Sequence, residues 1–172
     1  MAQEIGSAEY RVEALGSTHD RAAFRCGVPE LDAYLLRQAG QDQKRKLASI
    51  FILTKDGKNV AGFYTLSAHT ILAAELPADL ARSLPRFPVP VTLLGRMAIA
   101  QSLQGQGWGE FLLVHALKRA ALGSRQVASW AVVVDAKAGA RDFYLNQDFT
   151  LLPARPERLF LQMKTIEEMF DL

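Results

Sequence analysis

The chain has 172 residues, of which 49% are apolar and 22% are charged, and its formal net charge is +2. This length suits one well-buried core and is short for two ordinary domains, so we expect a single domain over residues 1–172. A net charge this small does not by itself indicate a nucleic-acid-binding protein. The only cysteine, Cys26, excludes an internal disulfide and a cysteine metal site. The sequence shows neither an export signal nor a long uncharged apolar run, so we expect a cytoplasmic protein without a membrane span.

Apolar periodicity and turn residues predict alternating strands and helices along the chain. The predicted elements are, in chain order, strand 10–15, helix 29–46, strands 49–54 and 60–70, helix 73–83, strand 91–99, helix 108–122, strand 128–136, helix 137–147, and strands 149–152 and 157–166. This order favours an α/β sandwich, in which a mixed, mostly antiparallel sheet carries helices on both faces.

A proline-rich segment, residues 84–90, separates the helix 73–83 from the strand 91–99. Its three prolines lack backbone donors, so we expect a rigid loop outside the sheet and a strand that begins directly after Pro90. The strand 91–99 is nearly continuously apolar, which indicates a central strand buried on both faces.

The most distinctive segment is the loop Gln104–Gly109, with the sequence Gln-Gly-Gln-Gly-Trp-Gly. Its three glycines let the backbone come close to a ligand. The helix that follows directs free N–H groups and the positive end of its dipole at the same place. The loop therefore predicts an anion site rather than an ordinary turn.

The glycine spacing excludes two common nucleotide-binding motifs. Gly109 is followed by Glu110 instead of the Lys-Ser/Thr that ends a Walker A loop. The glycines alternate as G-x-G-x-G, unlike the dinucleotide fingerprint, and Ser129 stands where that fingerprint needs an acidic residue. The pattern Q-x-x-G-x-G resembles instead the acetyl-CoA pyrophosphate loop of the GNAT acyltransferase superfamily.

Other segments extend this resemblance over residues 24–163. Residues 132–149 resemble the D-A…F-Y…G-F segment that closes GNAT domains. A more specific set resembles the GNAT toxins of type II toxin–antitoxin systems, which acetylate the α-amino group of aminoacyl-tRNA and so stop translation. This set comprises residues 24–35, 38–45, 61–68 and 90–99.

The resemblance implies a single GNAT domain with a defined cosubstrate site and no metal. The strands 91–99 and 128–135 would splay apart in the centre of the sheet, so that the pantetheine arm of acetyl-CoA inserts between them. The pantetheine contacts fall on the backbone amides of Met97, Ala98 and Ile99. The pyrophosphate contacts fall on the loop, Gln104, Gly105, Gln106, Gly107, Trp108 and Gly109, and Phe143 joins the cosubstrate contacts.

Two positions depart from the family pattern. Ala100 stands where many relatives carry an acidic residue after the fourth strand, and Asp148 stands where they carry a glycine before the closing phenylalanine. Neither position carries the proposed chemistry, so these departures affect the details of substrate choice rather than the family.

Tyr144 is the predicted general acid. Acetyl transfer from a thioester expels a thiolate, and a phenol within hydrogen-bonding distance can protonate it. The ordinary pKa of tyrosine is about 10, so a neutral phenol is available at pH 7. By its residues alone Tyr144 is explained equally well by packing on the last helix, and the resemblance of Phe143-Tyr144 favours the catalytic role.

No general base is evident, and an α-amine does not require one. Its pKa of about 7.7–8.0 leaves a useful fraction neutral near pH 7, unlike a lysine side chain. His69 and His115 are the candidates if a base exists, although His115 lies at helical spacing among apolar residues and His69 lies on a strand. No base neighbours Cys26 in the sequence, so we expect direct transfer rather than an acetyl-cysteine intermediate.

The basic residues and the resemblance together predict the partners. Lys44, Arg45, Arg86 and Arg96 become tRNA contacts under the resemblance, whereas by themselves they are solvated charges, and Arg96 could instead pair with a carboxylate. The resemblance further implies aminoacyl-tRNA as the acceptor, a ribbon-helix-helix antitoxin and a homodimer. Two other functions stay open, namely acetylation of a small amine or a protein N-terminus, and a non-catalytic acyl-CoA-binding module.

Overall fold

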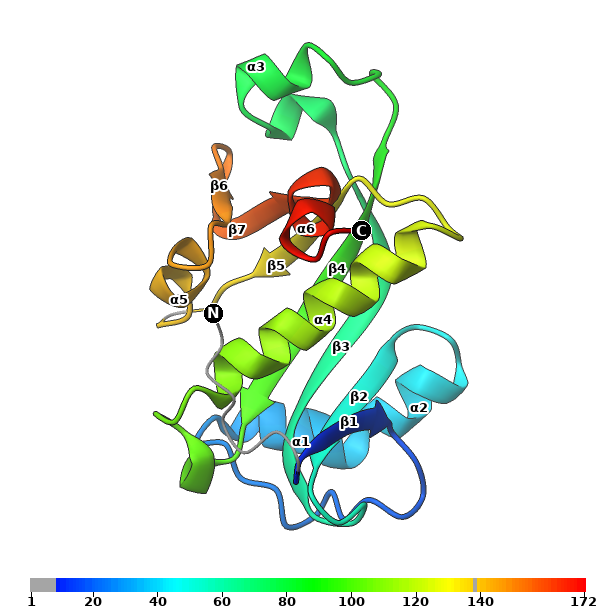
Figure 1. Cartoon of the computed structure of the whole chain (residues 1–172), viewed down its shortest axis with the longest axis vertical. Coiled ribbons are helices and arrows are strands. Elements are labelled where there is room, and N and C mark those ends of the chain that lie inside the picture. The colour runs from blue at the N-terminus through cyan, green and yellow to red at the C-terminus, as the bar shows by residue number, and fades with distance from the viewer. Residues whose placement is uncertain (1–8, 138) are drawn as a thin grey trace. The chain divides into compact units, whose positions relative to one another are not determined.

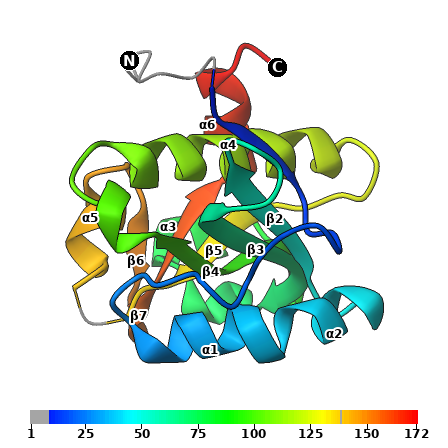
Figure 2. The same cartoon turned by 90° about the horizontal axis from the view of Figure 1, so that it is seen from below.

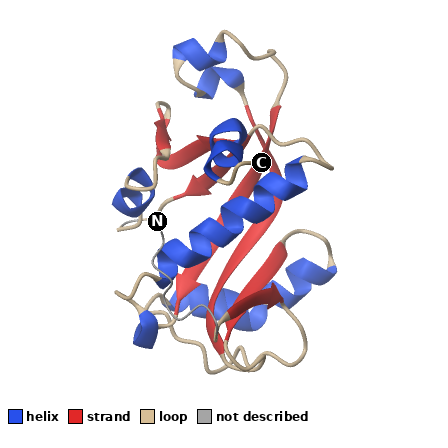
Figure 3. Cartoon of the chain, viewed as in Figure 1, coloured by secondary structure: helices blue, strands red, loops and turns tan. Residues whose placement is uncertain are grey.

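The computed structural model describes residues 9–137 and 139–172, and strands and helices alternate along them (Figure 3). The elements are β1 (Arg11–Ala14), α1 (Pro29–Arg37), α2 (Ala39–Lys44), β2 (Ser49–Thr54), β3 (Val60–Ile71), the 3-10 turn η1 (Ala73–Glu75), α3 (Ala78–Ala81), β4 (Val89–Ile99), the 3-10 turn η2 (Gln101–Leu103), α4 (Trp108–Ser124), β5 (Ala131–Asp135), α5 (Arg141–Leu145), β6 (Thr150–Leu152), β7 (Arg155–Gln162) and α6 (Met163–Met169). This order confirms the predicted α/β class and adds one helix, α6, that the sequence pattern did not predict.

The strands form a seven-stranded sheet in the order β1-β2-β3-β4-β5-β7-β6 (Figure 1). β2 pairs antiparallel with β1 and β3, and β7 pairs antiparallel with β5 and β6. β4 pairs with β5 in parallel, through Thr92–Leu94 and Val132–Val134. The sheet is therefore mixed and mostly antiparallel, as predicted.

The chain divides into two compact units. The first unit is Met1–Ser67 with Arg96–Ala116, and the second unit is Ala68–Gly95 with Leu117–Leu172. The long elements β3, β4 and α4 contribute residues to both units. Each unit contains its own cluster of buried apolar side chains.

In the first unit, α1 and α2 lie along one side of β2 and β3 (Figure 2). α1 begins at Pro29, whose fixed φ suits a first helical turn, and two acidic residues in that turn complement the helix dipole. Tyr34 and Leu35 are the buried residues of α1. The cluster that they join comprises Leu15, Phe24, Cys26, Ala39, Ile50, Ile52, Phe63 and Ala98.

The predicted helix 29–46 is two helices. The backbone leaves the helical region at Gln38, which has a φ of −120°, and α2 restarts at Ala39. Lys46 takes a left-handed φ of 63°, which ends the helical segment. The spacing of four correctly placed Leu35 and Ala39 in the core, because a break of one residue changes the inward face very little.

The predicted hairpin of β2 and β3 is confirmed. Its turn contains Gly57 at a φ of 78°, a conformation that a glycine adopts without a Cβ clash. The Asp56 carboxylate accepts hydrogen bonds from the backbone N–H groups of Lys58 and Asn59, at 2.9 and 2.8 Å. These bonds favour the ionised form and lower the pKa of Asp56 to about 2.

In the second unit, β4, β5 and β7 enclose an apolar cluster with η1 and α3. α3 lies beyond the ends of β3 and β4 (Figure 1). The clustered residues are Ile71, Leu76, Val89, Val91, Ala131, Val133, Leu152 and Phe160. The antiparallel register of β5 and β7 sets Val133 opposite Phe160, so that both side chains join this cluster.

Three predicted boundaries in the second unit are wrong. β4 begins at Val89 and so includes Pro90, which is tolerated near the start of a strand and whose carbonyl accepts the N–H of Trp130 at 2.8 Å. The helix 73–83 breaks at Pro77 into η1 and α3. The helix 137–147 shortens to α5, and residue 138 lies outside the described residues.

The last predicted strand, residues 157–166, is also too long. β7 ends at Gln162, and α6 follows at once. Met163 and Ile166, the buried residues of α6, are three positions apart and lie on one face of a helix. The apolar run 159–161, separated from Met163 by only one residue, hid this change of period.

Asp148 provides a stability test of the loop after α5. Its φ is 67°, in the left-handed region where a Cβ is unfavourable and glycine is not. We expect Asp148→Gly to raise the free energy of unfolding by about 0.5–1 kcal/mol, and Asp148→Ala to lower it. Chemical denaturation of the three proteins measures both changes. A glycine variant less stable than the alanine variant would contradict the role assigned to this backbone conformation.

Candidate active site

The glycine loop is fixed to the end of β4 by the side chain of Gln104. Its amide nitrogen donates to the carbonyl oxygen of Ile99 at 2.8 Å and to that of Cys26 at 2.7 Å. Gly105 and Gly107 follow with φ values of 76° and 88°. Glycine is required at these two positions because other residues rarely adopt such angles. The loop is thus a defined backbone conformation rather than a variable turn.

This conformation leaves a run of amide groups without acceptors. Among the described residues, the backbone hydrogen bonds include none donated by the N–H groups of Gly105–Gly109. The first bond of the following turn is donated by Phe111 to the carbonyl of Gly107, at 3.1 Å. α4 then runs for 17 residues and adds its dipole to these free donors. A phosphate group is the ligand that such a site accepts best.

Trp108 has a structural role in this loop. It is 4% exposed, and its ring lies 4.5 Å from that of Tyr10 and 5.3 Å from that of Phe111. Its packing anchors the first turn of α4, so that only its backbone N–H is available to a ligand.

The residues predicted to meet a pantetheine arm lie at the end of β4. Ala98 and Ile99 are buried, and Met97 is partly exposed. A Cβ added at Gly62 of β3 would lie 2.9 Å from the carbonyl oxygen of Ala98, so the backbones approach closely here. β4 continues to Ile99, past the segment Thr92–Leu94 that pairs with β5.

Tyr144 lies in the second unit, on α5. It is 7% exposed, and its ring packs edge-on against Phe143 at 5.1 Å and Phe149 at 5.4 Å. Burial disfavours the phenolate and raises the pKa of Tyr144 to about 12. The hydroxyl has no hydrogen-bond partner among the residues that the structure describes. Tyr144 is therefore a neutral phenol that can donate to an incoming group.

The two histidines proposed as alternative bases are engaged elsewhere. The Nδ1 of His115 lies 2.9 Å from the hydroxyl of Tyr64, a fully buried core residue. The Nε2 of His69 lies 3.1 Å from a guanidinium nitrogen of Arg158, which is itself paired with Asp135 at 2.7 Å. Arginine only donates, so Nε2 of His69 must be the acceptor and its lone pair is occupied.

The predicted RNA contacts are divided between the units. Lys44 and Arg45 are exposed at the end of α2, and Arg96 lies partly buried on β4, all in the first unit. Arg86 is exposed in the loop before β4, in the second unit. The guanidinium carbon of Arg96 lies 3.6 Å from the ring centroid of Tyr34, in a cation–π contact. Among the described residues no carboxylate pairs with Arg96, contrary to the alternative considered for it.

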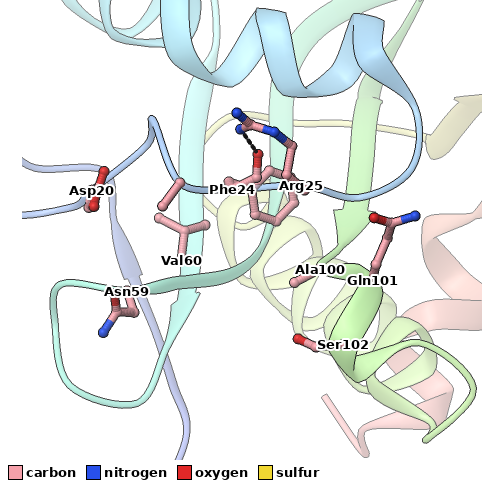
Figure 4. A pocket seen from close by; sticks show the side chains of 9 residues that line it. Asp20, Phe24, Arg25, Asn59, Val60, Ala100, Gln101 and Ser102 are labelled. Carbon is pink, nitrogen blue, oxygen red and sulfur yellow. Dashed lines mark hydrogen bonds between the residues drawn. The ribbon is translucent and has the colours of Figure 1, made fainter.

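A separate pocket of about 360 Å³ opens in the first unit beside η2. It is lined by Asp20, Ala23, Phe24, Arg25, Asn59, Val60, Ala100, Gln101 and Ser102 (Figure 4). The guanidinium of Arg25 is held by the carbonyls of Ala22 and Phe24, at 2.8 and 2.7 Å. Both bonds are donated by Nη1 and fix the side chain of Arg25 in the wall of this pocket, whose lining does not include the residues of the glycine loop.

The described residues form neither a metal site nor a membrane-spanning helix, and their cysteine is not activated. No cluster of three or more His, Cys, Asp or Glu is arranged to bind a metal ion. None of the helices there is long and apolar enough to cross a membrane. Cys26 is buried, and burial together with the Asp32 hydrogen bond raises the pKa of its thiol to about 11, so it is a poor nucleophile.

Sequence reasoning missed two features of this region. It placed Gln104 among the pyrophosphate contacts but did not predict that the Gln104 side chain holds the loop in place. It also missed the ring of Tyr34 beneath Arg96. No local pattern reveals either feature, because the partners are far apart in the chain.

Known proteins are similar to this chain in fold and in sequence. A sequence model of the Acetyltransferase (GNAT) family matches residues 15–149. A tRNA-acetylating toxin of Mycobacterium tuberculosis (strain ATCC 25618 / H37Rv) is 34% identical over 151 residues, which cover 87% of this chain and 90% of that protein. The structure of AtaT complexed with acetyl-methionyl-tRNAfMet has 30% identity and a TM-score of 0.87, over 94% of this chain and 99% of that one. A tyrosine-to-phenylalanine mutant of AtaT, bound to the C-terminus of the antitoxin AtaR and acetyl-CoA, has 28% identity and a TM-score of 0.83, over 95% and 99%. The chain belongs to the GNAT family of acetyltransferases.

Proposed function

We propose that this acetyltransferase transfers the acetyl group of acetyl-CoA to the α-amino group of aminoacyl-tRNA, and that it is a toxin that blocks translation. The assignment of acetyl-CoA as the cosubstrate rests on the run of free amide groups at Gly105–Gly109, in front of α4. The acceptor is inferred from relatives. The mycobacterial relative is a tRNA-acetylating toxin, and AtaT was solved with acetyl-methionyl-tRNAfMet.

Acetyl-CoA fits the residues of this chain at two places. The loop Gln104–Gly109 receives the pyrophosphate, because among the described residues the N–H groups of Gly105–Gly109 have no acceptor and two glycines hold them in one conformation. The backbone of Met97–Ile99 receives the pantetheine arm beyond the paired part of β4, and Phe143 adds an apolar contact. The thioester supplies an activated acyl group and a thiolate leaving group.

Tyr144 is the proposed general acid. The amine nitrogen forms a bond to the carbonyl carbon, and the carbon–sulfur bond then breaks. Tyr144 donates its phenolic proton to the departing sulfur, and the amine loses its extra proton to solvent. The phenolate of Tyr144 then takes up a proton from solvent, which restores the acid. A pKa near 12 keeps the donor protonated at every working pH, and a buried ring holds the hydroxyl in one orientation.

An α-amine suits this site because the two histidines considered as bases are engaged within the protein. His69 and His115 both use ring nitrogens in hydrogen bonds within the protein. An acceptor that is already partly neutral needs no such base, and the pKa of an α-amino group is about 7.7–8.0. Lysine side chains, with a pKa of about 10.4, are correspondingly poor acceptors.

The proposed RNA contacts are Lys44, Arg45, Arg86 and Arg96. Three are exposed cations that can neutralise phosphates. Arg96 differs because its guanidinium lies flat on a ring and has no ion-pair partner among the described residues, so its N–H edge is available to a phosphate oxygen.

The remaining assignments follow from the same proposal. The chain acts as one domain in the cytoplasm, where charged tRNA is found, and assembles as a homodimer. An antitoxin of the ribbon-helix-helix class neutralises it. AtaT, solved in complex with the C-terminus of its antitoxin AtaR, supports an antitoxin partner.

The test is transfer of labelled acetyl from acetyl-CoA onto a pool of charged tRNA, with deacylated tRNA as the control. We expect label on charged tRNA alone, and its release with the aminoacyl group on alkaline hydrolysis. Label on polyamines or protein N-termini but not on charged tRNA would select a different acceptor. Binding of acetyl-CoA without transfer to any amine would indicate a non-catalytic module.

A further inference from the structure

The guanidinium of Arg96 stacks on the aromatic ring of Tyr34. The guanidinium carbon of Arg96 lies 3.6 Å from the ring centroid, which is direct face-on contact. The same ring stacks on Phe63, with centroids 6.3 Å apart and planes at 19°. Phe63 in turn packs edge-on against Phe24 at 5.7 Å. Arg96 thus packs against a series of three aromatic rings in the first unit, Tyr34, Phe63 and Phe24, which we call the ring column.

A hydrogen bond of the Tyr34 hydroxyl also fixes the ring. The Tyr34 hydroxyl donates to a carboxylate oxygen of Asp42, in α2, at 2.9 Å. Burial, followed by this bond, raises the pKa of Tyr34 to about 12, so the phenol stays neutral. Tyr34 is 5% exposed and therefore contributes no polar group of its own to the surface. Its orientation is fixed by both stacking and a hydrogen bond.

The backbone N–H and the guanidinium of Arg96 are both held in place, but its positive charge has no carboxylate partner among the described residues. Its backbone N–H donates to the hydroxyl of Thr65 at 3.1 Å, which fixes the start of the side chain. Its guanidinium has no carboxylate partner in the part of the chain that the structure describes. Stacking covers the flat face of the group and leaves its N–H edge, which matches the geometry of two phosphate oxygens.

We infer that Tyr34 is a positioning residue for RNA binding, which holds Arg96 ready for a phosphate diester of the acceptor. This inference rests on the proposed function, since the phosphate is one of aminoacyl-tRNA. A long arginine side chain in water samples many rotamers and loses that freedom on binding. The Tyr34 ring, itself held by Phe63 and Asp42, restricts the Arg96 side chain before the RNA binds, so that less conformational entropy is lost on binding. Tyr34 itself touches neither substrate.

The experiment compares steady-state kinetics of Tyr34→Leu, Tyr34→Phe and Arg96→Gln with charged tRNA as the varied substrate. Tyr34→Leu removes the platform and is expected to raise KM for charged tRNA roughly three- to tenfold, the range of one cation–π contact. Its kcat at saturating tRNA and its KM for acetyl-CoA should stay at the values of the unmodified protein. Tyr34→Phe keeps the ring and should restore most of the tRNA affinity.

Two controls separate positioning from general damage to the core. Leu35→Val alters the neighbouring buried residue of α1, which takes no part in the ring column. It should lower thermal stability without changing KM for charged tRNA. Arg96→Gln should raise that KM at least as much as Tyr34→Leu and should reduce the slope of log Kd against log salt by about 1, as expected when one phosphate contact is lost.

The outcomes distinguish this inference from the function on which it rests. Absence of acetylation of charged tRNA by the unmodified protein overturns the proposed function. If that activity is present and Arg96→Gln raises KM, an unchanged KM in Tyr34→Leu overturns the positioning role. A rise in KM in Leu35→Val equal to that in Tyr34→Leu also overturns it, because the effect would then reflect packing of α1 alone.

Discussion

Replacing Tyr144 by phenylalanine is expected to lower kcat by about 10²- to 10⁴-fold, the contribution usual for a positioned acid. Acetyl-CoA affinity should stay close to that of the unmodified protein, because the ring and its contacts with Phe143 and Phe149 are retained. Only the hydroxyl is lost, and it has no hydrogen-bond partner among the described residues. Steady-state turnover with charged tRNA and calorimetric binding of acetyl-CoA measure the two quantities separately.

The matched control is Tyr64→Phe, which removes a hydroxyl from the core instead of from the proposed site. That hydroxyl bonds to His115, and its loss should reduce stability by about 1 kcal/mol without reducing kcat. Full turnover by Tyr144→Phe would remove Tyr144 from the mechanism. Loss of acetyl-CoA binding in that variant would show that the residue supports the fold of the site instead.

The dependence of rate on pH tests the same assignment without a mutation. A general acid acts in its protonated form, which is present below its pKa. Burial raises the pKa of Tyr144 to about 12, so the acid persists over the whole accessible range. We expect kcat/KM to rise through the α-amine pKa of about 7.7–8.0 and to show no falling limb up to about pH 10. A falling limb between these values would mean that the acid has a much lower pKa than Tyr144.

Features set by local sequence were predicted well. The loop Gln104–Gly109 was recognised because a left-handed backbone needs glycine, and Gly105 and Gly107 do adopt positive φ. The hairpin of β2 and β3 was recognised because Asp56-Gly57 is a turn signal between apolar runs. Each of these signals lies within a few residues of the structure that it specifies.

Features that depend on distant contacts were not predicted. Gln104 reaches the carbonyl of Cys26, 78 residues earlier in the chain. Tyr34 meets Arg96 only because α1 and β4 come together in the first unit. The sequence pattern predicts a strand at α6 because Met163 closely follows the apolar run 159–161. The spacing of residues along the chain carries no information about such partners.

Replacing Gly107 by valine is expected to raise the Kd of acetyl-CoA about 100-fold. The φ of Gly107 is 88°, a conformation that a β-branched residue does not adopt without strain. The loop must then rearrange, and the amides of Gly105–Gly109 no longer converge on one anion. Losing two charge-assisted hydrogen bonds of about 1.5 kcal/mol each corresponds to that factor. Calorimetric titration with acetyl-CoA measures the change directly.

Gly123→Val is the matched control, since it makes the same substitution on the exposed end of α4. The added Cβ meets no atom within 4 Å there, and the φ of Gly123 is not positive. This variant should bind acetyl-CoA as the unmodified protein does. Unchanged affinity in Gly107→Val would contradict the assignment of the pyrophosphate to the loop. A selective loss in that variant would tie the cosubstrate to one backbone conformation, the same one that Gln104 fixes to the end of β4.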